Sequence, residues 1–168
     1  MQKENDSLIF VVEDNRVYNK LIVSYLKANK FTNLMPFYTG EDVINNLYRN
    51  PDIIIQDFML DGMNGIDVLK KAKEMDTNIE FIFLSGQDNI DVAINTMKYG
   101  AYDYIVKDQM ALKKMVNKIN KIQSVNKLVQ TNKRYRVWVV FFFIALVVIV
   151  LVMLALTFLV PSKLGFLM

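Results

Sequence analysis

Four apolar runs in this chain each end on polar side chains that could do chemistry. Three of these side chains are carboxylic acids, one is a hydroxyl and one is an amine: Glu13, Asp14, Asp57, Ser85 and Lys107. Carboxylate oxygens suit Mg²⁺. A lysine and a metal can neutralise a phosphoryl group, a hydroxyl can donate to it, and a carboxylate can capture it covalently. The pattern predicts phosphoryl transfer to Asp57; considered alone, Asp57 could equally cap a turn.

The composition excludes several other kinds of site. The 168 residues include no cysteine and no histidine. Disulfides, thiolate metal sites, thiol nucleophiles and imidazole acid–base catalysis are therefore all excluded. Any chemistry must use carboxylates, hydroxyls and lysines.

Five apolar runs of strand length alternate with five stretches of helical spacing. The strands are predicted at 8–12, 33–38, 53–57, 79–84 and 101–106. The third helix is predicted to turn Ile66, Leu69, Ala72 and Met75 inward, and the fourth to carry Ile90, Ala93, Ile94 and Met97. This alternation predicts an α/β fold with a doubly wound parallel sheet. Pro36 places its strand at an edge, and the carboxyl ends of the other four strands should bring the polar side chains together.

With these residues in place, the chain resembles a response-regulator receiver domain of two-component signalling over about residues 7–122. The resemblance implies a flavodoxin-like sheet ordered 2-1-3-4-5 and a histidine kinase or phosphotransfer protein as the phosphoryl donor. It implies that Asp57 is the phosphoacceptor, and that Mg²⁺ is held by Glu13, Asp14, Asp57 and the backbone carbonyl of Met59. It also implies that Ser85 and Lys107 contact the phosphoryl group and that Tyr104 acts with Ser85 as a switch.

The chain departs from the family pattern near the acceptor. Asp108 follows Lys107 where the family usually has a proline, often with a cis peptide, so we expect a trans bond there. Asp61 occupies another common proline position and forms either an Asp-Gly turn or an additional acid near the metal. Met59 and Gln87 flank the path of a water attacking the acyl phosphate. Because Met59 is bulky and cannot hydrogen-bond, we expect it to slow self-dephosphorylation.

The C-terminal part is a different kind of sequence. Val137 to Val160 contains no charge, and Thr157 is its only polar side chain. Its 24 residues reach about 36 Å, enough to cross a hydrocarbon core of about 30 Å. A buried core helix is the alternative, although the chain offers little surface to cover one. Eight basic residues and no acid lie between 113 and 136, against Lys163 alone beyond the span, which predicts a single-pass cell-membrane protein with its N-terminal domain in the cytoplasm.

The predicted organisation is therefore a receiver domain at 1–122, a basic juxtamembrane helical extension at 123–136, a transmembrane helix at 137–160 and a short non-cytoplasmic tail at 161–168. Leu112, Met115, Val116 and Ile119 are expected to pack the fifth helix on the sheet, but the helical pattern continues beyond them. The spacing 112, 115, 119, 122, 126 and 129 is that of a coiled-coil seam, with Asn126 at a position where asparagine often sets a parallel dimer. The alternatives are a homodimer through this seam or a helix against lipid headgroups, with 113–160 contacting lipid. Nucleic-acid binding is the least favoured reading because no recognition element follows.

These features predict a membrane-tethered phosphoacceptor that is not an enzyme in its own right. It would signal through a conformational change that a downstream protein partner reads. The alternative is a receiver-like scaffold that keeps the fold without the phosphorylation. The complete set of acids, hydroxyl and lysine favours the first interpretation.

Overall fold

The computed structural model describes residues 7–75, 78–86 and 88–159, and within α5 it leaves the side chains of 129–137 and 157–159 undescribed. Five strands form one parallel sheet: β1 (Ile9–Val12), β2 (Leu34–Phe37), β3 (Ile53–Asp57), β4 (Glu80–Ser85) and β5 (Asp103–Val106). Their order is β2-β1-β3-β4-β5. This confirms the predicted sheet, including the edge position of the strand that carries Pro36.

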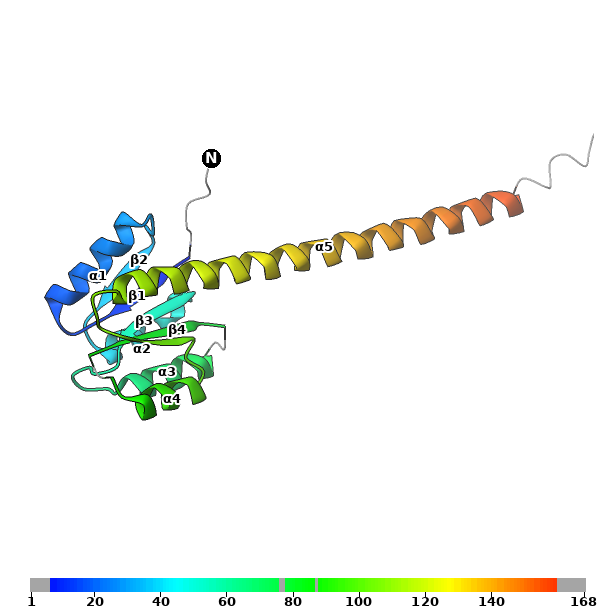
Figure 1. The fold of residues 1–168 in the computed structure, drawn as a ribbon. Coiled ribbons are helices and arrows are strands. Elements are labelled where there is room, and N and C mark those ends of the chain that lie inside the picture. The colour runs from blue at the N-terminus through cyan, green and yellow to red at the C-terminus, as the bar shows by residue number, and fades with distance from the viewer. Residues whose placement is uncertain (1–6, 76–77, 87, 160–168) are drawn as a thin grey trace, which may run out of the picture. The chain divides into compact units, whose positions relative to one another are not determined.

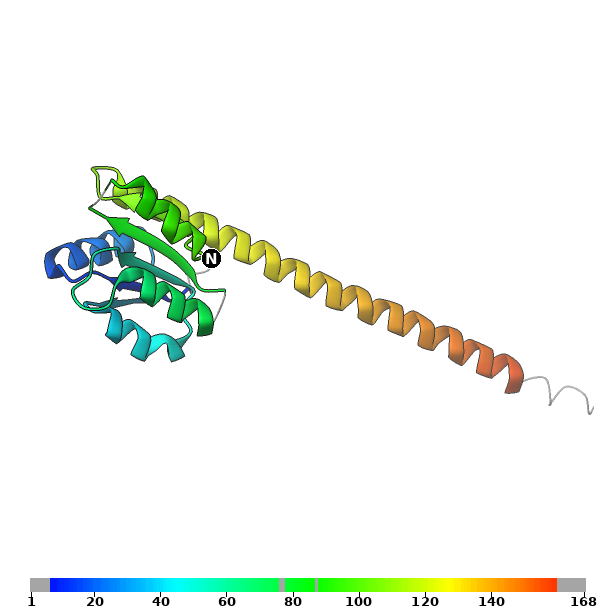
Figure 2. The ribbon, with the colours of Figure 1, turned by 90° about the horizontal axis from the view of Figure 1, so that it is seen from below.

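Helices cover both faces of the sheet, as Figures 1 and 2 show. They are α1 (Arg16–Ala28), α2 (Gly40–Asn46), α3 (Gly65–Met75), α4 (Ile90–Lys98) and α5 (Ala111–Leu159), with a short 3-10 turn at Leu47–Arg49. One core layer joins β-strand residues to α1 and to the first turns of α5, through residues such as Ile22, Leu26 and Ile119. The other joins the sheet to α2 and α3, through Val43 and Leu69.

Two helices bury less than their apolar spacing suggests. Leu69 and Ala72 of α3 are buried, but Met75, predicted to face inward, is 61% exposed because it is the last residue of the helix. In α4, Ile90, Ile94 and Met97 are all exposed, and Thr96 is the buried residue. Periodicity locates an apolar face of a helix but does not show that anything covers it.

The chain divides into two compact units, residues 1–123 and 124–168. In the first unit, Met115, Ile119 and Ile122 are buried and Leu112 packs against the same core. Four positions of the predicted seam are therefore occupied by the receiver's own core. Asn126, the next seam position, is exposed, and the side chain at 129 lies outside the described residues. A homodimer through the seam remains a prediction, with little of the seam available for it.

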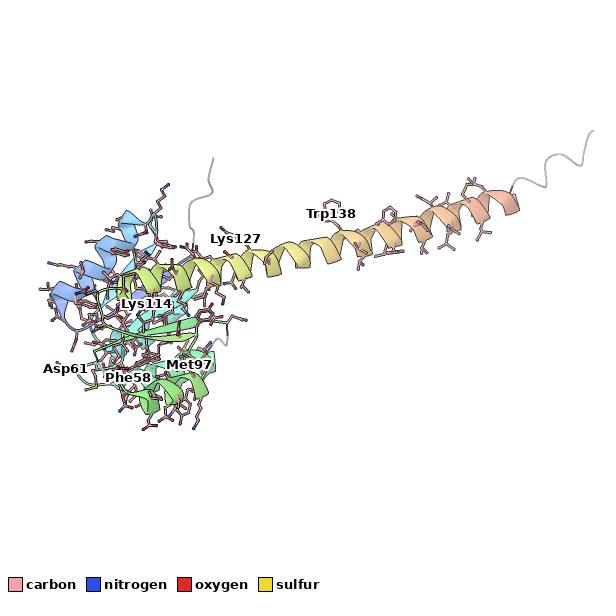
Figure 3. The ribbon with its side chains drawn as sticks, viewed as in Figure 1. Phe58, Asp61, Met97, Lys114, Lys127 and Trp138 are labelled. Carbon is pink, nitrogen blue, oxygen red and sulfur yellow. The ribbon has the colours of Figure 1, made fainter. Side chains whose placement is uncertain are left out.

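In the second unit, Trp138–Leu156 is long and apolar enough to cross a membrane, by length and composition only. Its described side chains are exposed throughout, including Trp138, which Figure 3 labels. The predicted tail at 161–168 and the end of the predicted span at Val160 lie outside the described residues. Membrane crossing therefore stays a proposal.

Candidate functional site

The acids gather at the carboxyl ends of two neighbouring strands. β1 and β3 pair in register, with Val12 beside Gln56, so the residues that follow them meet. Glu13, Asp14 and Asp57 each offer an oxygen, and these atoms lie within 4.8 Å of one another. Glu13 and Asp57 are buried, whereas Asp14 is half-buried. Three converging hard oxygen donors fit Mg²⁺, which keeps several of its own waters.

Lys107 enters the same cluster from the end of β5. Its Nζ donates to Oε2 of Glu13 at 2.8 Å and to Oδ2 of Asp57 at 2.6 Å. Burial lowers the pKa of Lys107, but the hydrogen bonds to Asp57 and Glu13 outweigh burial and hold the pKa above its usual range. Burial raises the pKa of Glu13, against the opposing hydrogen bond from Lys107. The ammonium therefore stays charged and balances two carboxylates.

Ser85 and Tyr104 lie on β4 and β5 beside these groups. Asp57 pairs with Leu84 in the sheet, so Ser85 comes one residue beyond the acceptor's partner. Ser85 is fully buried, and its carbonyl accepts from the Lys107 backbone N–H at 2.7 Å. Tyr104 is half-buried and packs edge-on against Phe58, with ring centroids 6.3 Å apart. The residue after the acceptor thus contacts the predicted switch.

The turn after β3 begins with a hydrogen bond to the acceptor. The Met59 backbone N–H donates to Oδ1 of Asp57 at 3.2 Å, and the Met59 side chain is 57% exposed. Asp61 is exposed and precedes Gly62, which has φ of +90°; Figure 3 shows Phe58 and Asp61 on this loop. Asp61 is not part of the acid cluster, which favours the Asp-Gly turn. Gln87, the other predicted flanking residue, lies outside the described residues.

Asp108 has a local role that sequence reasoning did not foresee. The described residues contain no cis peptide, so the Lys107–Asp108 bond is trans as expected. Oδ1 of Asp108 accepts from the Met110 N–H at 2.8 Å, and Oδ2 accepts from Lys114 Nζ at 2.6 Å. The hydrogen bond from Lys114 lowers the pKa of Asp108. These contacts fix the backbone between Lys107 and the start of α5.

Two further residues near the site were also missed. Asn19 is buried, and its Nδ2 donates to the carbonyls of Phe37 at 2.9 Å, Glu13 at 3.3 Å and Val11 at 3.4 Å. It ties α1 to the ends of β1 and β2. The Tyr18 ring lies against Lys107, whose Nζ is 4.7 Å from the ring centroid. The sequence offered one signal for Asn19, since an amide on the inner face of a predicted helix needs hydrogen-bond partners. No feature of the sequence indicated the contact between Tyr18 and Lys107.

A family model described as a response regulator receiver domain matches residues 9–120. The regulatory protein LuxO of Vibrio cholerae is 35% identical over 91 residues, which is 54% of this chain and 20% of LuxO. The transcriptional regulatory protein CssR of Bacillus subtilis is 34% identical over 100 residues, 59% of this chain and 44% of CssR. The chain thus spans less than half of each of these relatives.

Solved structures agree on the fold. The signal receiver domain of a putative LuxO repressor protein from Vibrio parahaemolyticus has a TM-score of 0.67 at 26% identity, covering 74% of this chain and 95% of that one. A CheX–CheY–BeF3–Mg²⁺ complex from Borrelia burgdorferi contains a chain with a TM-score of 0.63 at 23% identity, covering 69% and 88%. At that lower identity the likeness shows the fold alone.

Proposed function

Because this chain belongs to the response regulator receiver family, whose members accept a phosphoryl group with Mg²⁺ from histidine kinases or phosphotransfer proteins, we propose that Asp57 is its phosphoacceptor. One observation carries the proposal. The Lys107 ammonium binds Asp57 and Glu13 together within a cluster of three carboxylates. A capping aspartate would need neither the lysine nor the second and third acids.

The proposed reaction is a direct transfer of the phosphoryl group. A carboxylate oxygen of Asp57 attacks phosphorus, and the phosphorus–nitrogen bond of the donor phosphohistidine breaks. The bonding electron pair stays on the leaving imidazole nitrogen, which takes a proton from solvent. The product is an acyl phosphate on Asp57. This is nucleophilic capture by a carboxylate, and it needs no acid–base residue of the receiver.

The side chains around Asp57 supply positioning and charge. Lys107 pairs with a phosphoryl oxygen once Asp57 is modified, and the Ser85 hydroxyl donates to another. Glu13, Asp14, Asp57 and the Met59 carbonyl would hold Mg²⁺. When bound, Mg²⁺ supplies positive charge against the transferring phosphoryl oxygens.

The proposed output uses Ser85 and Tyr104, which lie on the neighbouring strands β4 and β5. When Ser85 closes over the phosphoryl group, Tyr104, whose ring packs against Phe58 in this structure, turns inward. A protein partner reads the resulting surface change. We propose no catalytic activity beyond the chain's own phosphorylation and dephosphorylation.

The second unit supports tethering to the cell membrane. Trp138–Leu156 is a candidate span with none of its side chains buried by the protein, and the preceding stretch from 113 to 136 is wholly basic in its charged residues. Anionic headgroups attract such a stretch, which would keep residues 1–123 on the cytoplasmic side. Tethering would raise the effective concentration of the receiver near a membrane kinase.

The test uses the full chain in nanodiscs, incubated with Mg²⁺ and phosphoramidate and followed by intact mass. We expect a gain of one phosphoryl group that disappears without Mg²⁺ and in Asp57→Asn. The matched control is Asp61→Asn, an exposed acid near the acceptor, which should still gain the group. Absence of any gain at every Mg²⁺ concentration would favour the membrane-anchored scaffold.

A further inference from the structure

Lys107 must serve two sets of partners. In this structure its ammonium is held by Glu13 and Asp57, which are also predicted metal ligands. Two cations cannot share those carboxylates without repelling each other. A metal in the cluster therefore weakens the pairing of Lys107 with these carboxylates, and phosphorylation of Asp57 changes one of its two partners. A contact that does not depend on the carboxylates would keep it there.

The Tyr18 ring is such a contact. Lys107 Nζ lies over its face, 4.7 Å from the centroid, within the range of a cation–π attraction. The ring face carries no formal charge and offers no lone pair that would trap the ammonium. Burial raises the pKa of the Tyr18 hydroxyl, so the side chain stays neutral.

The ring is also held in place from both sides along α1. The Tyr18 backbone N–H donates to Oδ1 of Asn15, the cap of the helix, at 3.1 Å. The next residue, Asn19, is anchored to three backbone carbonyls at the ends of β1 and β2. The ring packs against the core layer that contains Ile22 and Met115. Because its backbone is anchored and its side chain packs against the core, the ring is preorganised against Lys107.

We propose that Tyr18 is a positioning residue, whose ring face holds the Lys107 ammonium over the acid cluster in the orientation that meets the incoming phosphoryl group. This rests on the proposed function of Asp57. Tyr18 touches neither the phosphoryl group nor the metal in this scheme and acts through Lys107. Its contribution is to the rate of phosphorylation and not to the binding of Mg²⁺.

The test compares Tyr18→Phe, Tyr18→Leu, Lys107→Met and the double variant Tyr18→Leu/Lys107→Met in the full chain. The phosphorylation rate from phosphoramidate is measured at saturating Mg²⁺, and the Mg²⁺ dissociation constant is measured by calorimetry. We expect Tyr18→Phe to match the wild type, and Tyr18→Leu to be slower by about two- to thirtyfold, the range that a cation–π contact spans. The Mg²⁺ dissociation constant of Tyr18→Leu should be unchanged.

The double variant separates positioning from packing. If Tyr18 acts through Lys107, Tyr18→Leu has no further effect once Lys107 is methionine. An equal slowing in both backgrounds, a wild-type rate in Tyr18→Leu, or a Tyr18→Phe as slow as Tyr18→Leu would each overturn the proposal. A wild type that takes up no phosphoryl group would instead refute the proposed function.

A second series of variants tests the proposal even if Tyr18→Leu does not fold. Phenylalanines with increasing fluorination at position 18 withdraw electron density from the ring face while nearly keeping its shape. The proposal expects the rate to fall as fluorination increases. A constant rate across the series would contradict it.

Discussion

Two parts of this chain place side chains in opposite surroundings. At the carboxyl ends of β1, β3 and β5, the buried carboxylates of Glu13 and Asp57 both pair with the ammonium of Lys107, which is half-buried. In Trp138–Leu156 large apolar side chains are exposed along the whole segment. The fold supplies the surroundings of the first part, so its chemistry follows from its geometry. The protein does not cover the described side chains of the second part, and we propose that lipid does.

The largest expected effect tests the apolar segment. Val147→Lys with Leu151→Lys puts two charges one turn apart near its centre, at a cost to insertion of about 6 kcal/mol in total. We expect the chain to lose its resistance to alkaline extraction from membranes, whereas Val147→Leu with Leu151→Val keeps it. Phosphorylation from phosphoramidate should be unchanged. A doubly charged chain that still resists extraction would contradict the proposed membrane span.

The next largest effect tests the hydrogen bonds by which Asn19 joins α1 to the ends of β1 and β2. Asn19→Ala leaves the carbonyls of Phe37 and Glu13 without their side-chain donor in the buried end of the sheet, and should cost about 2 kcal/mol. The measurement is urea unfolding of the full chain in detergent. Asn29→Ala is the matched control, because its Nδ2 donates to the Tyr25 carbonyl at 2.9 Å in an exposed setting. Equal losses in the two variants would mean that Asn19 has no special structural role.

Met59 should affect the lifetime of the acyl phosphate on Asp57 rather than the rate at which it forms. Its half-exposed side chain next to the acceptor cannot orient a water, so the acyl phosphate should be long-lived. Met59→Asn adds a hydrogen-bonding group and should speed the loss of phosphate several-fold, with Met59→Leu as the control. The idea fails if the wild type loses its phosphate within seconds and Met59→Asn slows the loss.

The smallest effect concerns pH in the absence of Mg²⁺. Burial raises the pKa of Glu13, so its carboxyl binds a proton more tightly in the folded chain than in the unfolded chain. Its contribution to stability therefore falls as the pH rises from its ordinary value of 4.5 through the folded pKa. Glu13→Gln should gain stability relative to the wild type over that window, and saturating Mg²⁺ should remove the gain. A stability difference that does not change with pH would contradict this.

The sequence was most informative where strand ends carry polar residues. Apolar runs ending in Glu13, Asp57, Ser85 and Lys107 predicted both the sheet and the convergence of these residues, because parallel strands share an edge. Pro36 fixed the edge strand, since it cannot donate to a central ladder. The exposure of Ile94 could not be predicted, because spacing does not report what lies opposite a helix face.

Contacts between segments far apart in the chain also could not be predicted from the sequence. Tyr18 meets Lys107 only once α1 and β5 are packed on the same sheet, and no local pattern marks the pair. The apolar spacing of α5 was ambiguous in a related way. Met115 and Ile119 were expected to pack on the sheet, which the structure confirms, although their spacing also fits a dimer seam.

Reductive trapping of the acyl phosphate tests directly whether Asp57 accepts the phosphoryl group. The full chain is incubated with Mg²⁺ and phosphoramidate and then treated with borohydride, which reduces an aspartyl phosphate to homoserine, and peptide mass spectrometry identifies the converted position. We expect conversion at Asp57, dependent on Mg²⁺ and slowed in Lys107→Met. Conversion at Asp14 or Asp61, or at no aspartate, would contradict it.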